Sequence, residues 1–148
     1  MKLVLPSMLR TQVVEAAGAG FPRECCGLIE GEWQGATALA MALHPARNSD
    51  ERNDRFAIHP EDHFAALRQA RAHGRALIGC YHSHPNGSPS PSATDRDGAG
   101  EENFLWLIAA LSAADGPVTV EAFVYSAAGF FSIGLTEAVG ADLVTSSE

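Results

Sequence analysis

Residues 76–95, ALIGCYHSHPNGSPSPSATD, carry an apolar run directly into a polar loop. The run at 76–81 is continuous rather than alternating, which is typical of a strand buried on both faces of a sheet. The loop after it is rich in proline, glycine and serine, and it ends in SATD at 92–95, the serine-to-acid spacing of a helix capping box. The sequence therefore predicts a central strand that ends at His82 and His84, followed by a short capped helix.

The flanking segments supply two longer helices and the other strands. One helix is predicted over 7–19, where apolar residues recur at helical spacing after a serine cap. A second is predicted over 60–73, with Phe64, Leu67 and Ala70 facing inward and a glycine ending it. The strands are predicted at 25–33, 36–43, 56–58, 104–111, 118–125 and 130–135. The tail beyond Val139 is weakly specified.

This order of helix, strands, helix and strands indicates a mixed α/β fold of the α+β class. The chain shows no internal repeat and no linker, and its length suits one domain over 1–148. Hydrophobic residues make up 46% and charged residues 19%, the balance of a folded, soluble protein. Because there is neither a secretory signal nor an apolar run long enough to span a bilayer, we expect a cytoplasmic protein that does not bind membranes.

Charge and cysteine content argue against further classes of function. The net charge of −8 repels phosphate backbones, so nucleic acid is a poor candidate partner. The three cysteines are an odd number, two of them (Cys25 and Cys26) are adjacent, and none forms a CxxC pair. We therefore expect reduced thiols and no structural zinc site built from cysteines.

His82 and His84 are candidate metal ligands. Residues two apart in an extended segment project from the same face, so both imidazoles point the same way. Neutral imidazoles bind zinc well, although two histidines at a strand end are also common as ordinary polar surface. Asp95 follows eleven residues after His84 and has two compatible interpretations, as a support of the helix cap or as a third ligand mounted on it. Three protein ligands would leave the fourth position of zinc open for water.

A hydrolase would also need a carboxylate beside that water as general base. Glu15 falls in the middle of the first predicted helix, and Glu30 and Glu32 flank a turn expected to start at Gly31. Glu24 directly precedes an apolar strand, where partial burial would raise its pKa toward a useful value. Residue chemistry alone favours Glu24 but leaves the choice open.

Two segments resemble the signatures of one enzyme family. The stretch ECCGL at 24–28 resembles the E-x-C-G-L signature of JAMM (MPN-plus) metallopeptidases. The stretch from His82 to Asp95 resembles their H-[ST]-H-P-x6-S-x-x-D signature, with each expected residue at the expected spacing. The resemblance covers most of the chain, because the order of elements is also similar. It implies a cytidine-deaminase-like sandwich, in which a curved, mainly antiparallel sheet is flanked by helices.

The resemblance also implies roles for individual residues. By this likeness His82, His84 and Asp95 bind one zinc ion, Glu24 activates the water and Ser92 hydrogen-bonds the oxyanion. JAMM enzymes cleave after the C-terminal Gly-Gly of ubiquitin or ubiquitin-like proteins. The candidate substrate loops at 44–56 and 96–104 are short, so we expect a compact, bacterial-type enzyme acting on a ubiquitin-like sulfur-carrier protein. Asp97 lacks the spacing to Ser92 and is expected at the surface.

Two other functions remain open from the sequence: a metal-free MPN scaffold and a DNA-associated relative of the RadC type. The first would lose ligands that are present here, and the acidic charge disfavours the second. The sequence does not fix the metal, the exact carrier, the residue released, the oligomeric state or the order of the loop at 86–91. Cys80 and Trp106 are expected in the core, and Cys25 and Trp33 have no assigned role. Four single histidines are expected at the surface: His44, His59, His63 and His73.

Overall fold

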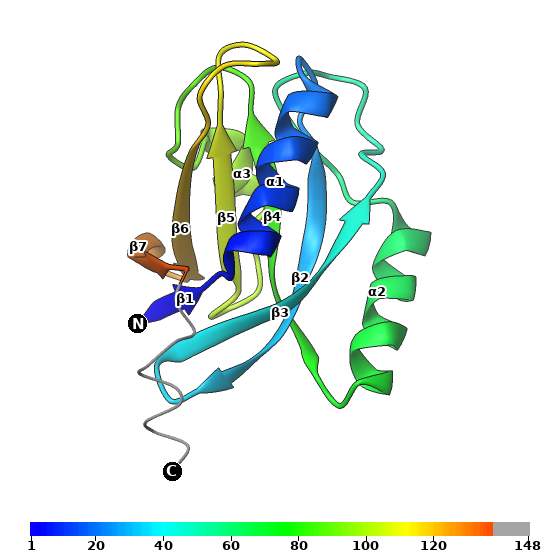
Figure 1. The fold of residues 1–148 in the computed structure, drawn as a ribbon, viewed down its shortest axis with the longest axis vertical. Helices are drawn as coiled ribbons and strands as arrows, with labels where there is room; N and C mark the ends of the chain where they lie inside the picture. Colours follow the sequence, from blue (N-terminus) through cyan, green and yellow to red (C-terminus); the bar gives the residue numbers. More distant parts are fainter. Residues whose placement is uncertain (138–148) are drawn as a thin grey trace.

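The computed structural model describes residues 1–137, and the weakly specified tail lies outside them. Seven strands and three helices make up this part of the chain (Figure 1). In chain order they are β1 (Lys2–Val4), α1 (Ser7–Gly20), β2 (Cys26–Gln34), β3 (Thr37–Ala46), α2 (Pro60–Ala72), β4 (Ala76–His84), α3 (Ala93–Gly98), β5 (Leu105–Ala110), β6 (Thr119–Ser126) and β7 (Gly129–Thr136). No helix within residues 1–137 is long and apolar enough to cross a bilayer.

The sheet is curved to the point of closure, with the strand order β1-β3-β2-β4-β5-β6-β7. Four of its pairings are antiparallel and three are parallel, which confirms the mixed α/β class. Closure depends on β1, which pairs in parallel with both β3 and β7. Sequence analysis missed this strand, because three residues ahead of a proline carry too little periodicity. The predicted sheet, curved and mainly antiparallel, is therefore closed into a barrel-like form.

The helices α1 and α2 lie against opposite faces of the sheet (Figure 1). Buried residues of α1, among them Leu9 and Val13, join the larger hydrophobic cluster. Successive side chains of β5 point to opposite faces of the sheet. Leu107 therefore packs in the hydrophobic cluster that includes α1, and Trp106 packs in the cluster that includes α2. Because Cys80 of β4 also lies in the α2 cluster, the side chains two and four residues beyond it emerge on that same face.

Two details of the prediction are wrong. Phe64 of α2 is 65% exposed, and Ala66 and Ala70 face the sheet instead, because positions four apart share a helix face whereas Phe64 lies two residues off it. Gly31 starts no turn, since β2 continues to Gln34. The backbone of Gly31 lies so close to the carbonyl of Leu39 on β3 that a side chain would clash there. The close approach of β2 and β3 therefore explains why a glycine occupies this position.

Candidate metal centre

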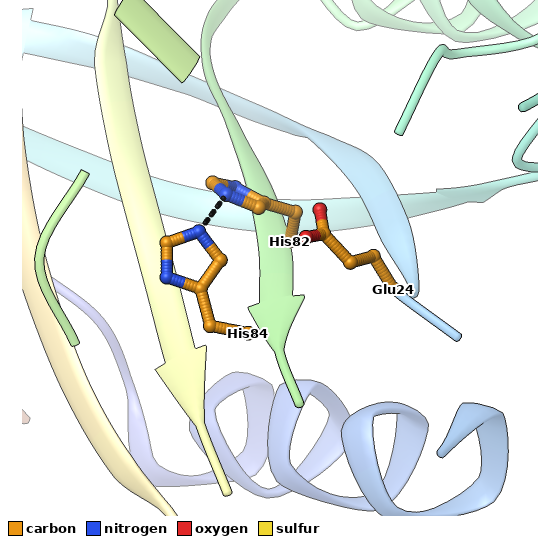
Figure 2. Close-up of side chains that lie close together, drawn as sticks. All are labelled: Glu24, His82 and His84. Carbon is orange, nitrogen blue, oxygen red and sulfur yellow. Dashed lines mark hydrogen bonds between the residues drawn. The ribbon is translucent and has the colours of Figure 1, made fainter. Parts of the chain in front are cut away.

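His82 and His84 stand at the carboxyl end of β4, flanked by β2 and β5. Both are buried, and their Nε2 atoms lie 2.9 Å apart (Figure 2). An aromatic wall surrounds His82: the Phe56 ring stacks on it at a centroid distance of 4.4 Å, and Trp106 meets it edge-on at 5.7 Å. The strand geometry thus points both imidazoles to the same side of the sheet, where aromatic rings pack against His82.

Asp95 reaches the same point from α3. The Ser92 hydroxyl accepts the amide N–H of Asp95 at 3.0 Å, and Asp95 Oδ2 accepts the amide N–H of Ser92 at 2.9 Å, which completes the predicted capping box. The same Oδ2 atom lies 3.1 Å from His82 Nε2 and 2.9 Å from His84 Nε2. Asp95 therefore caps the helix and faces both histidines at once, so the two interpretations of this residue are compatible.

The donor set fits a divalent cation. His84 Nδ1 lies 2.8 Å from the carbonyl oxygen of Ser88, which can only accept, so the ring proton belongs on Nδ1 and the Nε2 lone pair faces Asp95. Burial opposes ionisation of Asp95, but its close contacts with the two histidine rings outweigh burial and hold its pKa well below the ordinary value. Two imidazole nitrogens and a carboxylate oxygen thus converge, which is a set of ligands that zinc accepts.

The two histidines differ in proton affinity. Burial lowers the pKa of His82, and its contact with Asp95 does not restore it. Burial also disfavours the charged form of His84, but that form would donate to both Asp95 and the Ser88 carbonyl, and this raises its pKa above the ordinary value. The Nδ1 atom of His82 is buried and has no hydrogen-bond partner among the described residues.

Glu24 completes the cluster from the segment just before β2. It is 4% exposed, and one of its carboxylate oxygens lies within 4.8 Å of a ring nitrogen of each histidine (Figure 2). Its Oε1 atom is buried without a partner in the described residues. Burial raises the pKa of Glu24 to about 8, while His84 lowers it and Asp95 raises it further. The predicted direction of this shift is confirmed.

Close packing of β2 on β4 brings Glu24 to this position. The Cys25 amide donates to the Ser83 hydroxyl at 2.8 Å, and the Ser83 amide donates to the Cys25 carbonyl at 3.1 Å. Beside them the Tyr81 ring crosses directly over Gly27, where any side chain would collide with it. The glycine of the E-x-C-G-L segment therefore has a physical reason, since it lets the strand that follows Glu24 approach the strand of the histidines.

The competing acids lie away from the cluster. Glu15 and Glu32 are exposed, whereas Glu30 is fully buried within β2. Its carboxylate contacts His44 Nε2 at 2.8 Å, His73 Nδ1 at 2.8 Å and a guanidinium nitrogen of Arg75 at 3.0 Å. The predicted surface position of His44 is wrong, because only 14% of its side chain is exposed. Burial raises the pKa of Glu30, but these three hydrogen bonds outweigh burial and lower it.

Glu30→Gln is expected to lower the free energy of unfolding by about 2–3 kcal/mol at pH 7, because Arg75 loses its anionic partner. The folded-state pKa of Glu30 lies below the reference value of 4.5, so its stabilisation is complete above about pH 4.5 and is lost as the pH falls below that value. Urea unfolding at pH 7 and pH 3.5 measures both effects, with the exposed Glu32→Gln as control. An equal loss of stability at both pH values would contradict the carboxylate's role.

A pocket of about 710 Å³ opens beside Asp95 on the α2 face of the sheet. Aromatic and aliphatic side chains line it, including Phe56, Leu77 and Trp106, and Arg71 and Arg75 lie at its rim toward the start of β4. Phe56 belongs to both the pocket and the wall over His82. Sequence analysis assigned 56–58 to a brief strand and missed this role. Its only signal was an aromatic residue directly after a polar loop.

The family model for prokaryotic homologues of the JAB domain matches residues 6–124. That match covers every group of the site. The chain belongs to the family of prokaryotic JAB-domain proteins. This confirms the resemblance to JAMM proteins that the two segments indicated.

Two curated proteins resemble this JAB-domain chain. A desampylase of Haloferax volcanii is 35% identical over 95 residues, which are 64% of this chain and 67% of that protein. The tail tip assembly protein K of Escherichia phage N15 is 30% identical over 93 residues, or 60% of this chain. The chain spans about a third of the phage protein's length, since the match covers 34% of it.

Two solved structures share the fold of this JAB-domain chain. The solution structure of a protein from Desulfitobacterium hafniense has a TM-score of 0.77 and 24% identity, and the alignment covers 91% of each chain. A solution structure of a protein from Salinibacter ruber has a TM-score of 0.71 and 28% identity over 94% of this chain and 92% of that one. Likeness over nearly the whole length supports the arrangement of strands and helices described above.

Proposed function

We propose that this protein is a zinc-dependent metallopeptidase that hydrolyses the peptide or isopeptide bond after the C-terminal Gly-Gly of a ubiquitin-like sulfur-carrier protein. The observation that carries the proposal is the convergence of His82, His84 and Asp95 next to Glu24, whose buried Oε1 has no partner among the described residues. A merely structural ion pair would leave no reason to bury a fourth, unpartnered carboxyl group beside it.

His82, His84 and Asp95 would hold the ion. A zinc ion bound there supplies Lewis acidity toward a water molecule and toward the carbonyl of the scissile bond. Glu24 accepts the proton of the attacking water on its carboxylate and later delivers it to the nitrogen of the leaving amine. Burial raises the pKa of Glu24, which makes its carboxylate a stronger proton acceptor than an exposed one.

Ser92 donates a hydrogen bond to the oxygen of the attacked carbonyl. Its hydroxyl oxygen accepts the Asp95 amide, so the oxygen is held at the start of α3. No described residue accepts a hydrogen bond from this hydroxyl, so its hydrogen can be donated to the substrate. A hydrogen bond given to a developing oxyanion is worth a few kcal/mol in other hydrolases. Ser92 thus serves both the capping box and the substrate oxygen.

The substrate assignment is supported by the similarity to the desampylase of Haloferax volcanii. The loops beside the site add to it. The segments between β3 and α2 and between α3 and β5 carry no helix or strand of their own, which suits a small carrier better than a long chain of modifiers. The apolar pocket beside Asp95 offers space for side chains of an extended carrier tail.

The test uses zinc-loaded protein and a ubiquitin-like sulfur carrier whose Gly-Gly end is extended by one cysteine or by a short peptide. Mass spectrometry is expected to detect the carrier ending at Gly-Gly, and a chelator is expected to abolish the product until zinc is restored. The matched substrate carries Ala-Ala in place of Gly-Gly and should remain intact. If all Gly-Gly carriers stay uncleaved although one zinc is bound per chain, the peptidase assignment fails. Stable carrier binding without cleavage would then indicate a scaffold.

A further inference from the structure

The side chain of Asn48 uses its full hydrogen-bonding capacity in the segment between β3 and α2. Its Nδ2 group donates to the Glu24 carbonyl at 2.9 Å and to the Arg55 carbonyl at 3.2 Å. Its Oδ1 atom accepts the amides of Asp50 at 2.9 Å and Ala57 at 3.0 Å. An amide side chain offers two N–H groups and two lone pairs, and here all four are engaged.

The accepted bonds fold the segment back on itself. Asn48 and Ile58 form an isolated antiparallel bridge, and the Ser49 amide donates to the Ala57 carbonyl at 2.8 Å. The donated bond to Glu24 has a different effect, because it ties this folded segment to a residue 24 positions earlier in the chain. The Oδ1 atom of Asn48 therefore builds the segment, whereas its Nδ2 group both bonds the segment at Arg55 and attaches it to Glu24.

The attachment matters because of what the segment carries. Asn48 bonds the backbone of Arg55 and of Ala57, the residues on either side of Phe56. Phe56 in turn stacks on His82, with an interplanar angle of 24°. The same amide thus fixes the backbone of Glu24 and the backbone of the aromatic wall over His82.

Glu24 depends on such a tether. Its Oε1 atom has no hydrogen-bond partner in the described chain, so the carboxyl group is oriented by its own backbone and by packing. On one side of Glu24 the backbone is held through Cys25 and Ser83. At Glu24 itself the carbonyl is held by Asn48.

We propose that Asn48 is a positioning residue, which holds Glu24 in register with the histidine pair by tying it to the segment that carries Phe56. This inference rests on the proposed function, since it concerns the group assigned as general base. It assigns Asn48 no contact with substrate. Displacing a catalytic group by about 1 Å can lower a rate by about 100-fold, so the tether should affect turnover more than substrate binding.

The Asn48→Asp variant tests the hydrogen bonds that Asn48 donates separately from those that it accepts. A carboxylate can still accept the amides of Asp50 and Ala57, but it cannot donate to the carbonyls of Glu24 and Arg55. We expect kcat to fall by about 10- to 100-fold, with KM changed by less than about threefold and zinc content unaltered. Asn53→Asp is the matched control, because it makes the same chemical change at an exposed asparagine in the same segment.

Amide hydrogen exchange in metal-free protein gives a second readout, independent of activity. In Asn48→Asp the Cys25 amide should exchange faster while the amides of Asp50 and Ala57 stay protected. In Asn48→Ala all three should exchange faster, which keeps the test open if the aspartate variant folds poorly. Asn53→Asp should leave all three unchanged.

The outcomes separate the two proposals. Parental kcat in Asn48→Asp, or a change confined to KM, overturns the positioning role while the peptidase stands. A parent protein that cleaves no carrier overturns the peptidase and, with it, any role of Asn48 in turnover. Unchanged exchange at Cys25 in both Asn48 variants would show that the tether does not hold the segment of Glu24.

Discussion

Glu24→Gln is expected to lower kcat by about 10²- to 10⁴-fold while the protein keeps its zinc. Glutamine preserves the size of the side chain and its burial, but its amide cannot accept a proton from water and return it to the leaving amine. Elemental analysis and a steady-state assay on the same sample measure the two quantities together. The exposed Glu15→Gln on α1 is the control and should leave both unchanged.

A different result would reassign Glu24. Its carboxylate lies within 4.8 Å of ligand atoms of both histidines, so it could in principle bind an ion alongside them. Loss of zinc in Glu24→Gln would make Glu24 a ligand. Full activity with zinc retained would show that another group takes the proton of the water.

Asp95→Asn is expected to weaken zinc binding by at least about 100-fold and to abolish cleavage. Changes in residues that only support a metal ligand typically cost 10- to 100-fold, and Asp95 supplies the anionic donor itself. Asparagine keeps the shape and can still accept the Ser92 amide, so helix α3 should retain its cap. Competition with a chromophoric chelator measures the affinity of the variant against the parent.

Asp97→Asn is the matched control for this change, because it makes the same substitution two residues away at an exposed position. It should bind zinc as the parent does. If both variants bind zinc equally well, Asp95 acts only as a helix cap, which is the second interpretation that its sequence position allows.

The sequence indicated which residues of the candidate site lie together better than it indicated their surroundings, for physical reasons. His82, His84 and Asp95 fall on one strand end and the capped helix just after it, so local geometry brings them together. Glu24 joins them only because β2 pairs with β4, with Cys26 opposite His82. That pairing is long-range, and residue chemistry could only favour Glu24 among the acids.

What the sequence did not predict depends on contacts between distant segments. The apolar residues of α2 did not show which helix side would meet the sheet, so Phe64 was placed inward although it is 65% exposed. The roles of Phe56 and Asn48 arise from how the segment between β3 and α2 folds onto Glu24 and His82. Burial of Glu30 is offset by its contacts with His44 of β3 and with His73 and Arg75 of the segment between α2 and β4.

Because β1 pairs with β7, the sheet can close only after both strands have been synthesised. During synthesis β1 emerges first, and its partner β7 emerges after every other strand. Until then one side of β1 and the outer side of β6 are unpaired edges, which can attract other chains. Glu24, His82, His84 and Asp95 have all been made before β6 begins. A nascent chain therefore carries all the side chains of the candidate metal centre while its sheet is still open.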